Sequence, residues 1–169
     1  AFESDPTLKV TSWKVVRVDL GAIDPGTIAR EAKGVLKITG TGLSENISVS
    51  LRPRDGRVVA RVGDVSRTFS RTQIRKIVIN GQAGDDQIVI GAGVMGVSVD
   101  GGDGDDSILG GEGADYLGGG WGKDSISGGG GNDLLFGGAA MDRIRGGAGR
   151  DVTQKDLLDR VEKDVEVVG

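Results

Sequence analysis

Six abutting nine-residue repeats fill residues 101–154 and constrain the fold of this chain more than any other feature. Each begins with Gly-Gly and has Asp at its sixth position, and five of the six have Ile or Leu at the eighth. Thr153 takes the eighth position of the last repeat, and one further copy lies upstream at 81–89. Such a fixed period is typical of stacked repeats. The six units read GGDGDDSIL, GGEGADYLG, GGWGKDSIS, GGGGNDLLF, GGAAMDRIR and GGAGRDVTQ.

The first six residues of each unit predict a turn, and the last three predict a short strand. Glycine adopts the positive φ angles of tight turns without steric cost. The apolar residue at position eight would point inward, while its two neighbours point outward. Two units would therefore close one coil. The stacked coils would bury only a thin ladder of Ile and Leu, which could not alone offset backbone ordering of about 1–2 kcal/mol per residue.

The composition indicates a hard cation as the missing stabilising partner. The chain contains no Cys and no His, so thiolate and imidazole ligands are excluded. Residues 81–151 hold twelve acidic and four basic side chains, a net charge of −8 that would keep the segment expanded without counter-ions. Calcium takes six to eight oxygen ligands at about 2.3–2.6 Å, which carboxylates and turn carbonyls could supply, whereas Mg²⁺ prefers strict octahedral geometry. We therefore expect several calcium ions between the turns.

These repeats resemble the RTX family, the calcium-binding β-roll of secreted bacterial proteins, over residues 81–154. In that family the position-six Asp bridges the ions above and below it, and turn carbonyls complete the coordination. The resemblance implies an all-β chain that forms a right-handed parallel β-roll or β-helix solenoid and binds about five calcium ions. The implied carboxylate ligands are Asp86, Asp106, Asp115, Asp124, Asp133, Asp142 and Asp151. The implied carbonyl ligands are those of Gly101, Asp103, Gly110, Glu112, Gly119, Trp121, Gly128 and Gly130.

Stacking would arrange the turns in two columns, with ions between consecutive turns of a column. The turn at 91–96 contains no Asp, so we expect no good site there. Ala140 replaces the glycine at position four, so we expect a strained turn or a weaker site. One column would hold the turns beginning at Gly81, Gly101, Gly119 and Gly137, and the other those beginning at Gly91, Gly110, Gly128 and Gly146. The expected sites lie between Asp106 and Asp124, Asp124 and Asp142, Asp115 and Asp133, Asp133 and Asp151, and Asp86 and Asp106.

Residues 91–96 also match the Gly-x-Gly-x-x-Gly pattern of dinucleotide-binding turns. That mechanism needs a helix after the turn, so that the helix N-terminus meets the pyrophosphate. The β-branched Val97 and Val99 follow instead, and then glycine. We therefore interpret the segment as one degenerate coil unit.

Residues 1–80 carry no glycine repeat and predict short strands separated by turns. Asp24 and Pro25 additionally predict a short helix over 27–33. We divide the chain into a β-strand-rich cap or solenoid extension (1–80), the calcium-binding β-roll (81–154) and a C-terminal cap or tail (155–169), for which a short amphipathic helix is one option. The expected strands lie at 13–20, 35–40, 47–52, 58–62, 68–70 and 74–79.

The first 80 residues are basic, with fourteen basic and eight acidic side chains. They form either a patch for an acidic polysaccharide or cell surface, or simply the solvated faces of strands, and the second is favoured because charged residues usually face water. Only Phe2, Trp13 and Phe69 are aromatic in this segment, too few to interleave with the basic residues and stack on bases, so we expect no nucleic-acid partner. No apolar run is long enough to span a membrane.

Three classes of function fit this pattern. The first is a secreted, extracellular calcium-binding module that folds as it binds the ion. The second is a polysaccharide- or surface-binding appendage of a larger secreted enzyme or adhesin. The third is a catalytic β-helix, which would need carboxylates free of metal, and no second set is phased outside the repeats. We therefore expect a calcium-binding monomer with no catalytic residue and no organic cofactor.

Overall fold

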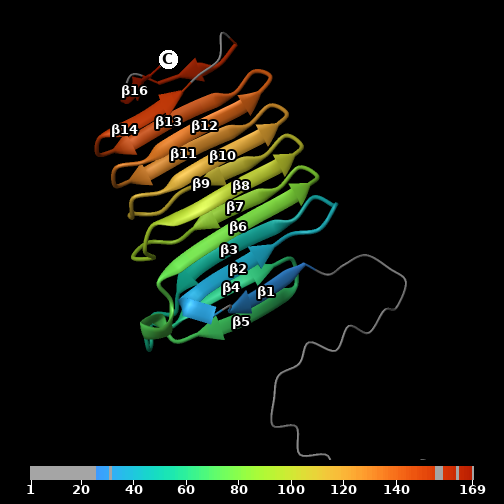
Figure 1. Ribbon diagram of the computed structural model, residues 1–169, viewed down its shortest axis with the longest axis vertical. Helices are drawn as coiled ribbons and strands as arrows, with labels where there is room; N and C mark the ends of the chain where they lie inside the picture. Colours follow the sequence, from blue (N-terminus) through green and yellow to red (C-terminus); the bar gives the residue numbers. More distant parts are fainter. Residues whose placement is uncertain (1–25, 31, 155–157, 163, 169) are drawn as a thin grey trace, which may run out of the picture.

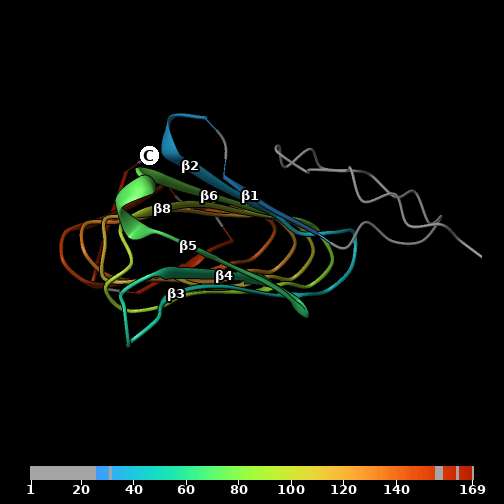
Figure 2. The same cartoon turned by 90° about the horizontal axis from the view of Figure 1, so that it is seen from below.

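The structure is a computed structural model that describes residues 26–30, 32–154, 158–162 and 164–168. Its strands stack one above another (Figure 1) in two layers (Figure 2). Each layer is an eight-stranded sheet, with the orders β1-β2-β6-β8-β10-β12-β14-β16 (sheet A) and β15-β13-β11-β9-β7-β3-β4-β5 (sheet B). The strands are β1 (Thr27–Arg30), β2 (Val35–Thr39), β3 (Asn46–Leu51), β4 (Val58–Val62), β5 (Val65–Phe69), β6 (Lys76–Ala83), β7 (Gln87–Ile90), β8 (Val97–Asp103), β9 (Ser107–Leu109), β10 (Tyr116–Trp121), β11 (Ser125–Gly130), β12 (Leu134–Ala139), β13 (Arg143–Ala148), β14 (Asp151–Gln154), β15 (Arg160–Val161) and β16 (Val165–Val167).

Each nonapeptide contributes one turn and one strand, and successive strands join opposite sheets. Ile126 pairs with Ile108 and with Ile144 in sheet B, and Leu117 pairs with Leu135 in sheet A, all in parallel. Paired residues are thus two repeats apart, so two units make one coil. The expected all-β parallel solenoid of the β-roll type is confirmed.

The position-eight side chains form the interior of the roll. Ile108, Leu117, Ile126, Leu135 and Ile144 are at most 1% exposed. Thr153, which breaks the apolar rule, is also fully buried, and its hydroxyl donates a hydrogen bond of 2.7 Å to the carbonyl of Leu135. The last repeat therefore keeps the same orientation, because its polar group has a partner.

The solenoid begins before the first glycine repeat. Strand β2 pairs in parallel with β6, and β3 pairs in parallel with β7. Strands β1, β4 and β5 pair antiparallel with their neighbours and form this end of the stack (Figure 2), where Val65 and Phe69 pack against the core. Both sheets continue past residues 80 and 154. The division at those two residues stays a prediction.

The helix expected over 27–33 is wrong. Thr27–Arg30 is strand β1, in which Ile28 is buried and pairs with Ile38 of β2, and a short 3-10 turn (η1, Ala32–Gly34) follows. Pairing with β2 buries this β-branched residue, which outweighs the local helix-start signals. The strand expected at 13–20 lies outside the described residues.

Two other segments also form strands. After 91–96 the chain enters β8 directly, so the dinucleotide interpretation is excluded for want of a helix. In the tail, β15 and β16 extend sheets B and A, and no helix occurs among residues 158–162 and 164–168. None of the helices in the described part of the chain is long and apolar enough to cross a membrane.

Candidate metal sites in the turns

The seven position-six aspartates stand in the turns and are buried together with the core. Their exposed fractions are 4% or less, which is unusual for carboxylates. They form the two expected columns. One contains Asp86, Asp106, Asp124 and Asp142, and the other contains Asp115, Asp133 and Asp151.

One oxygen of each carboxylate links two coils. The Oδ1 atom accepts a hydrogen bond from the backbone N–H of the position-six residue one coil earlier. Asp106 donates to Asp124 and Asp124 donates to Asp142, each at 2.8 Å. In the other column, Asp115 donates to Asp133 at 2.9 Å and Asp133 to Asp151 at 3.0 Å. These bonds fix the side-chain rotamers and leave Oδ2 to face its own turn.

The second oxygen is uncompensated. Among the described residues, the Oδ2 atoms of Asp86, Asp106, Asp124, Asp133 and Asp151 are buried and accept no hydrogen bond. A buried carboxylate oxygen without a partner is costly, and its presence in several successive turns calls for a ligand. A cation is the complementary ligand for such an oxygen.

A backbone oxygen of the next coil approaches each of four of these atoms. A Cβ placed on Gly101 would stand within 3.0 Å of both Asp106 Oδ2 and the carbonyl oxygen of Gly119. We call the convergence of a carbonyl oxygen and a carboxylate oxygen that accepts no hydrogen bond, beside a position-one glycine, an oxygen cradle. The four cradles pair Asp86 with Gly101, Asp106 with Gly119, Asp124 with Gly137, and Asp133 with Gly146.

The cradles explain why position one is glycine. The φ angle of Gly101 is not positive, so its backbone conformation does not require glycine. A side chain there would collide with the two oxygens that converge on it. The glycines at positions two and four have a different cause, because Gly120 and Gly122 have φ angles of 117° and 123°.

Burial raises the pKa of five aspartates in the columns. Desolvation raises the pKa of Asp86 and Asp124 to about 7 and that of Asp133 to about 6, against the opposing effect of the backbone N–H that each accepts. The pKa values of Asp106 and Asp115 are raised for the same reason. The fold therefore holds these groups where their charged form needs a positive partner.

The donor set fits a calcium ion. No cluster of three or more acidic side chains suited to a metal occurs among the described residues, so most ligands must be backbone oxygens. Calcium accepts mixed carboxylate and carbonyl oxygens in flexible geometry. The residues that would hold it are the cradle aspartates and the position-one glycines opposite them.

The expected carbonyl ligands divide into three groups. The carbonyls of Gly101, Gly119 and Gly128 each point at the position-one glycine of the preceding coil, beside its aspartate. The carbonyls of Asp103 and Trp121 accept hydrogen bonds of 2.7 Å from the N–H groups of Gly84 and Gly104, so an ion would have to share them. For the carbonyls of Gly110, Glu112 and Gly130, ligation stays a prediction. The cradles add Gly137 and Gly146, which an extension of the position-one rule would have included.

In the first turn of each column, hydrogen bonds rather than an ion compensate the carboxylate oxygens. In the Asp115 turn, Oδ2 accepts the N–H of Gly111 at 2.9 Å and Oδ1 accepts the N–H of Val97 at 2.9 Å. This turn faces the aspartate-free turn 91–96, where the absence of a good site stays a prediction. Its glycines at positions two and four, Gly111 and Gly113, also lack the positive φ angles of the other turns.

Glu45 closes the other column and was missed at the sequence level. Its N–H donates to Asp86 Oδ1 at 2.8 Å, so it occupies the position-six place of an earlier coil. Its own carboxylate accepts bonds from the backbone N–H and the hydroxyl of Thr41. Residues 40–48, GTGLSENIS, keep glycine at position one and Ile at position eight, and that was the available signal.

Asp159 continues the same column at the other end. Its Oδ1 accepts the N–H of Asp142 at 3.2 Å, and its side chain is buried. No glycine pattern marks this coil in the sequence, so spacing from Asp142 was the only signal. The strain expected at Ala140 is present, because its φ angle is 88°.

Comparison with known proteins gives one match. A family model described as the RTX calcium-binding nonapeptide repeat (4 copies) matches residues 78–94, 98–126 and 118–152. No curated protein and no solved structure matches the chain. Together with the phased aspartates and the stacked coils, the match shows that residues 78–152 of this chain are RTX calcium-binding nonapeptide repeats folded as a β-roll.

Proposed function

We propose that this chain is the calcium-loaded β-roll module of a secreted protein, and that calcium at extracellular concentrations completes its folding. The observation that carries the proposal is the set of buried Oδ2 atoms without partners among the described residues, four of which face a glycine carbonyl. An ion in each cradle would compensate the negative charge of the aspartate, which is buried in a region of low dielectric constant.

Four cradles support a count of four ions in two unequal columns, three in the column of Asp106 and one in that of Asp133. The site expected between Asp115 and Asp133 would be a fifth. The Oδ2 atom of Asp115 already accepts the N–H of Gly111, so an ion at this site would have to displace or share that hydrogen bond. We therefore propose four well-formed sites and a weaker fifth.

The energetics favour binding coupled to folding. The repeats bury one apolar side chain per strand, and without ions the aspartates would be buried and charged. Sites made largely of backbone oxygens should bind in the range of about 10⁻⁴–10⁻³ M, as extracellular calcium modules do. Such affinity would leave the sites empty at the low calcium level of a cytosol.

The test is a calcium titration of the full chain after removal of divalent ions. Calorimetry should give about four ions per chain, and far-ultraviolet circular dichroism should show a gain of β structure that a chelator reverses. Magnesium at the same concentration should give neither. A chain that binds no calcium, or whose spectrum is the same with and without it, would contradict the proposal.

Two neighbouring glycines offer a matched pair of variants. A Cβ on Gly119 would collide with Asp124 Oδ2 and the carbonyl of Gly137, whereas a Cβ on Gly118 would meet only the carbonyl of Val99 at 3.7 Å. Gly119→Ala should therefore lose one ion, and Gly118→Ala should keep the full count. Equal counts in the two variants would rule out the cradle as the binding position.

A further inference from the structure

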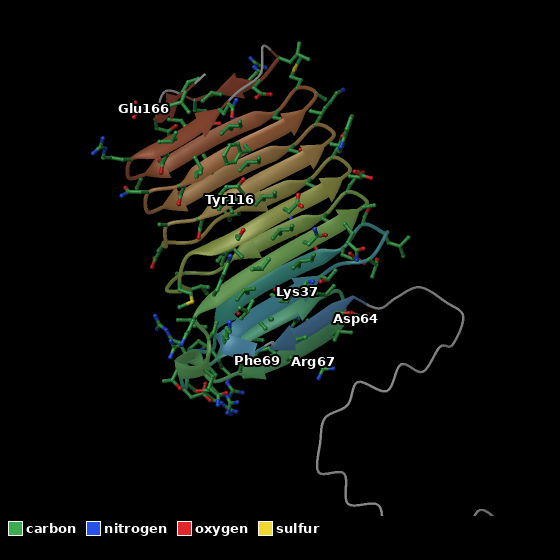
Figure 3. The ribbon with its side chains drawn as sticks, in the orientation of Figure 1. Lys37, Asp64, Arg67, Phe69, Tyr116 and Glu166 are labelled. Carbon is green, nitrogen blue, oxygen red and sulfur yellow. The ribbon has the colours of Figure 1, made fainter. Side chains whose placement is uncertain are left out.

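The outer face of sheet A contains a hollow of about 480 Å³, and no column aspartate lines it. Its wall is formed by side chains of β6, β8, β10 and β12, whereas the column aspartates stand in the turns and are buried. Figure 3 shows Tyr116 on this broad face, with Lys37 and Glu166 further along the stack in opposite directions. We call it the Gly118 hollow, defined by Asn80, Asp100, Tyr116, Gly118 and Phe136.

Strand register brings these residues together. Asn80, Asp100, Gly118 and Phe136 occupy the same row across four strands, because each pairs with the next in parallel. Tyr116 lies two residues before Gly118 on β10, so it points to the same face. Gly118 therefore leaves a gap in the row, with a carboxylate on one side and an aromatic ring on the other.

The fold does not require glycine at position 118. Its φ angle is not positive, and a Cβ there would make only one ordinary contact, with the carbonyl of Val99 at 3.7 Å. Glycine inside a strand also weakens that strand. The last residue of the other five tandem repeats is Leu109, Ser127, Phe136, Arg145 or Gln154, each of which carries a side chain. The missing side chain creates the hollow.

The two rings form a platform rather than a cage. The ring centroids of Tyr116 and Phe136 are 5.0 Å apart and the ring planes are tilted by 38°. Rings this close touch each other, so no group fits between them, and a ligand must lie over them. Tyr116 is 48% exposed, so its ring is available to solvent.

The polar side of the hollow matches the platform. Asn80 Nδ2 donates to Asp100 Oδ2 across a long 3.3 Å contact, so the amide and the carboxylate keep hydrogen-bonding capacity. Among the residues that the structure describes, no cationic side chain lines the hollow, and Asp100 disfavours an anionic ligand. A flat ring with one weakly polar face and several adjacent hydroxyl groups satisfies both sides.

We propose that the Gly118 hollow binds a neutral pyranose unit of a glycan. The sugar ring stacks on Tyr116 and Phe136, and its hydroxyl groups hydrogen-bond to Asn80 and Asp100. The sugar would contact side chains of the outer face rather than the column aspartates, which gives the module a ligand of its own.

Saturation-transfer nuclear magnetic resonance on the full chain in calcium tests the site. The probes are hexasaccharides of glucose (β-1,4 and α-1,4), mannose and N-acetylglucosamine, with oligogalacturonate and tetramethylammonium as charged counter-probes. At least one neutral oligosaccharide should bind, and each charged probe should bind more weakly than that oligosaccharide. The absence of binding by every neutral probe, or preference for a charged one, overturns the proposal.

Variants locate the site. Gly118→Val fills the hollow, and Tyr116→Ala removes half of the platform, so each should weaken binding at least about tenfold. Tyr116→Phe keeps the ring and should retain binding. The matched control is Ser127→Val, the same repeat position on sheet B.

Calcium stoichiometry and thermal midpoint separate this site from the proposed function. Gly118→Val should keep the ion count and leave the midpoint unchanged or higher. Wild-type glycan affinity in Gly118→Val would place any binding elsewhere and overturn the assignment. If the wild-type chain binds no calcium but still binds the glycan, the calcium proposal is wrong and the glycan proposal stands.

Discussion

The backbone N–H of Asp106 donates a hydrogen bond of 2.8 Å to Oδ1 of Asp124, whereas Oδ2 of Asp124, within the described part of the chain, accepts none. One carboxylate thus has a structural oxygen and an uncompensated one. The structural oxygen holds two coils in register, and the other faces the carbonyl of Gly137 beside Gly119. A substitution that changes only the second oxygen can therefore separate folding from metal binding.

Asp124→Asn is that substitution. The amide oxygen still accepts the N–H of Asp106, and the amide nitrogen can donate to the Gly137 carbonyl. We expect calorimetry to show the loss of one ion, while urea unfolding without calcium shows a gain of about 1 kcal/mol because a buried charge has gone. Asp64→Asn, an exposed position far from the columns with the same charge change, should alter neither. Loss of two ions would instead show that Asp124 bridges the sites on both sides.

The raised pKa values predict an inverted pH dependence for the calcium-free fold. The pKa values of Asp86 and Asp124 are raised by burial to about 7 in the folded chain, from an ordinary value of 3.8. The folded state therefore binds more protons than the unfolded state between these values, and stability falls as pH rises through that window. Urea unfolding in chelator-treated buffer should give a higher free energy at pH 4.5 than at pH 7.5.

Calcium should reverse this order. Protons and calcium compete for the same carboxylates, so calcium affinity should fall as pH drops below about 7, the pKa of Asp86 and Asp124. Titrations at pH 5.5 and pH 7.5 would measure the difference. A calcium-free fold that is more stable at pH 7.5 than at pH 4.5 would show that these aspartates are not desolvated as the structure indicates.

The repeat period predicted much of this architecture, because every feature with a fixed position in the period has a fixed place in space. The residues at position eight form the core of the roll, and the aspartates at position six form the two columns. Glu45 and Asp159 take position-six places in coils that lack the Gly-Gly signature, so the period alone did not reveal them. The helix expected over 27–33 failed because pairing with β2, not the local sequence, decides that segment.

The Gly118 hollow illustrates a second limit. Asp100, Gly118 and Phe136 are each 18 residues from the next, so the period of two repeats already predicts that they lie side by side in β8, β10 and β12. The turn 91–96 makes one coil two residues longer than the others. Asp86 and Asp106 are 20 residues apart, whereas Asp106 and Asp124 are 18 residues apart. The contact between the Tyr116 and Phe136 rings and the hollow above Gly118 had to come from the structure, because they depend on side-chain positions.

Thr41→Val tests the closed end of the first column. The hydroxyl of Thr41, which is 5% exposed, donates to the carboxylate of Glu45, and valine cannot. We expect a loss of about 1 kcal/mol in the free energy of unfolding, because a half-buried carboxylate oxygen of Glu45 loses its donor. The calcium count should not change, since the Glu45 oxygen that lies with the Gly81 carbonyl beside Gly40 still accepts the N–H of Thr41 and is not one of the four cradles. Thr68→Val on the exposed edge strand β5 is the control and should be near neutral.

Ala140→Gly should stabilise the protein. Ala140 has a φ angle of 88°, in a region that costs residues with a Cβ about 1–2 kcal/mol. We expect the calcium-loaded variant to gain about 1 kcal/mol in urea unfolding, less the extra chain entropy that glycine brings. Ala148→Gly, in a repeat position without positive φ, should instead lose about 0.5–1 kcal/mol. A loss in both variants would mean that Ala140 is not strained.

Removal of calcium should unfold the roll unevenly, because its core is uneven. Strands β2, β3, β4 and β6 each bury two or three apolar side chains, whereas β10 to β13 bury one apolar side chain each. Hydrogen exchange after chelation should show early loss of protection in β10 to β13 and continued protection in β2 to β4. The reason is that apolar burial stabilises the N-terminal coils, while the repeats depend on ions to compensate their aspartates. Loss of protection at one rate along the whole stack would show instead that the two regions fold as a single cooperative unit.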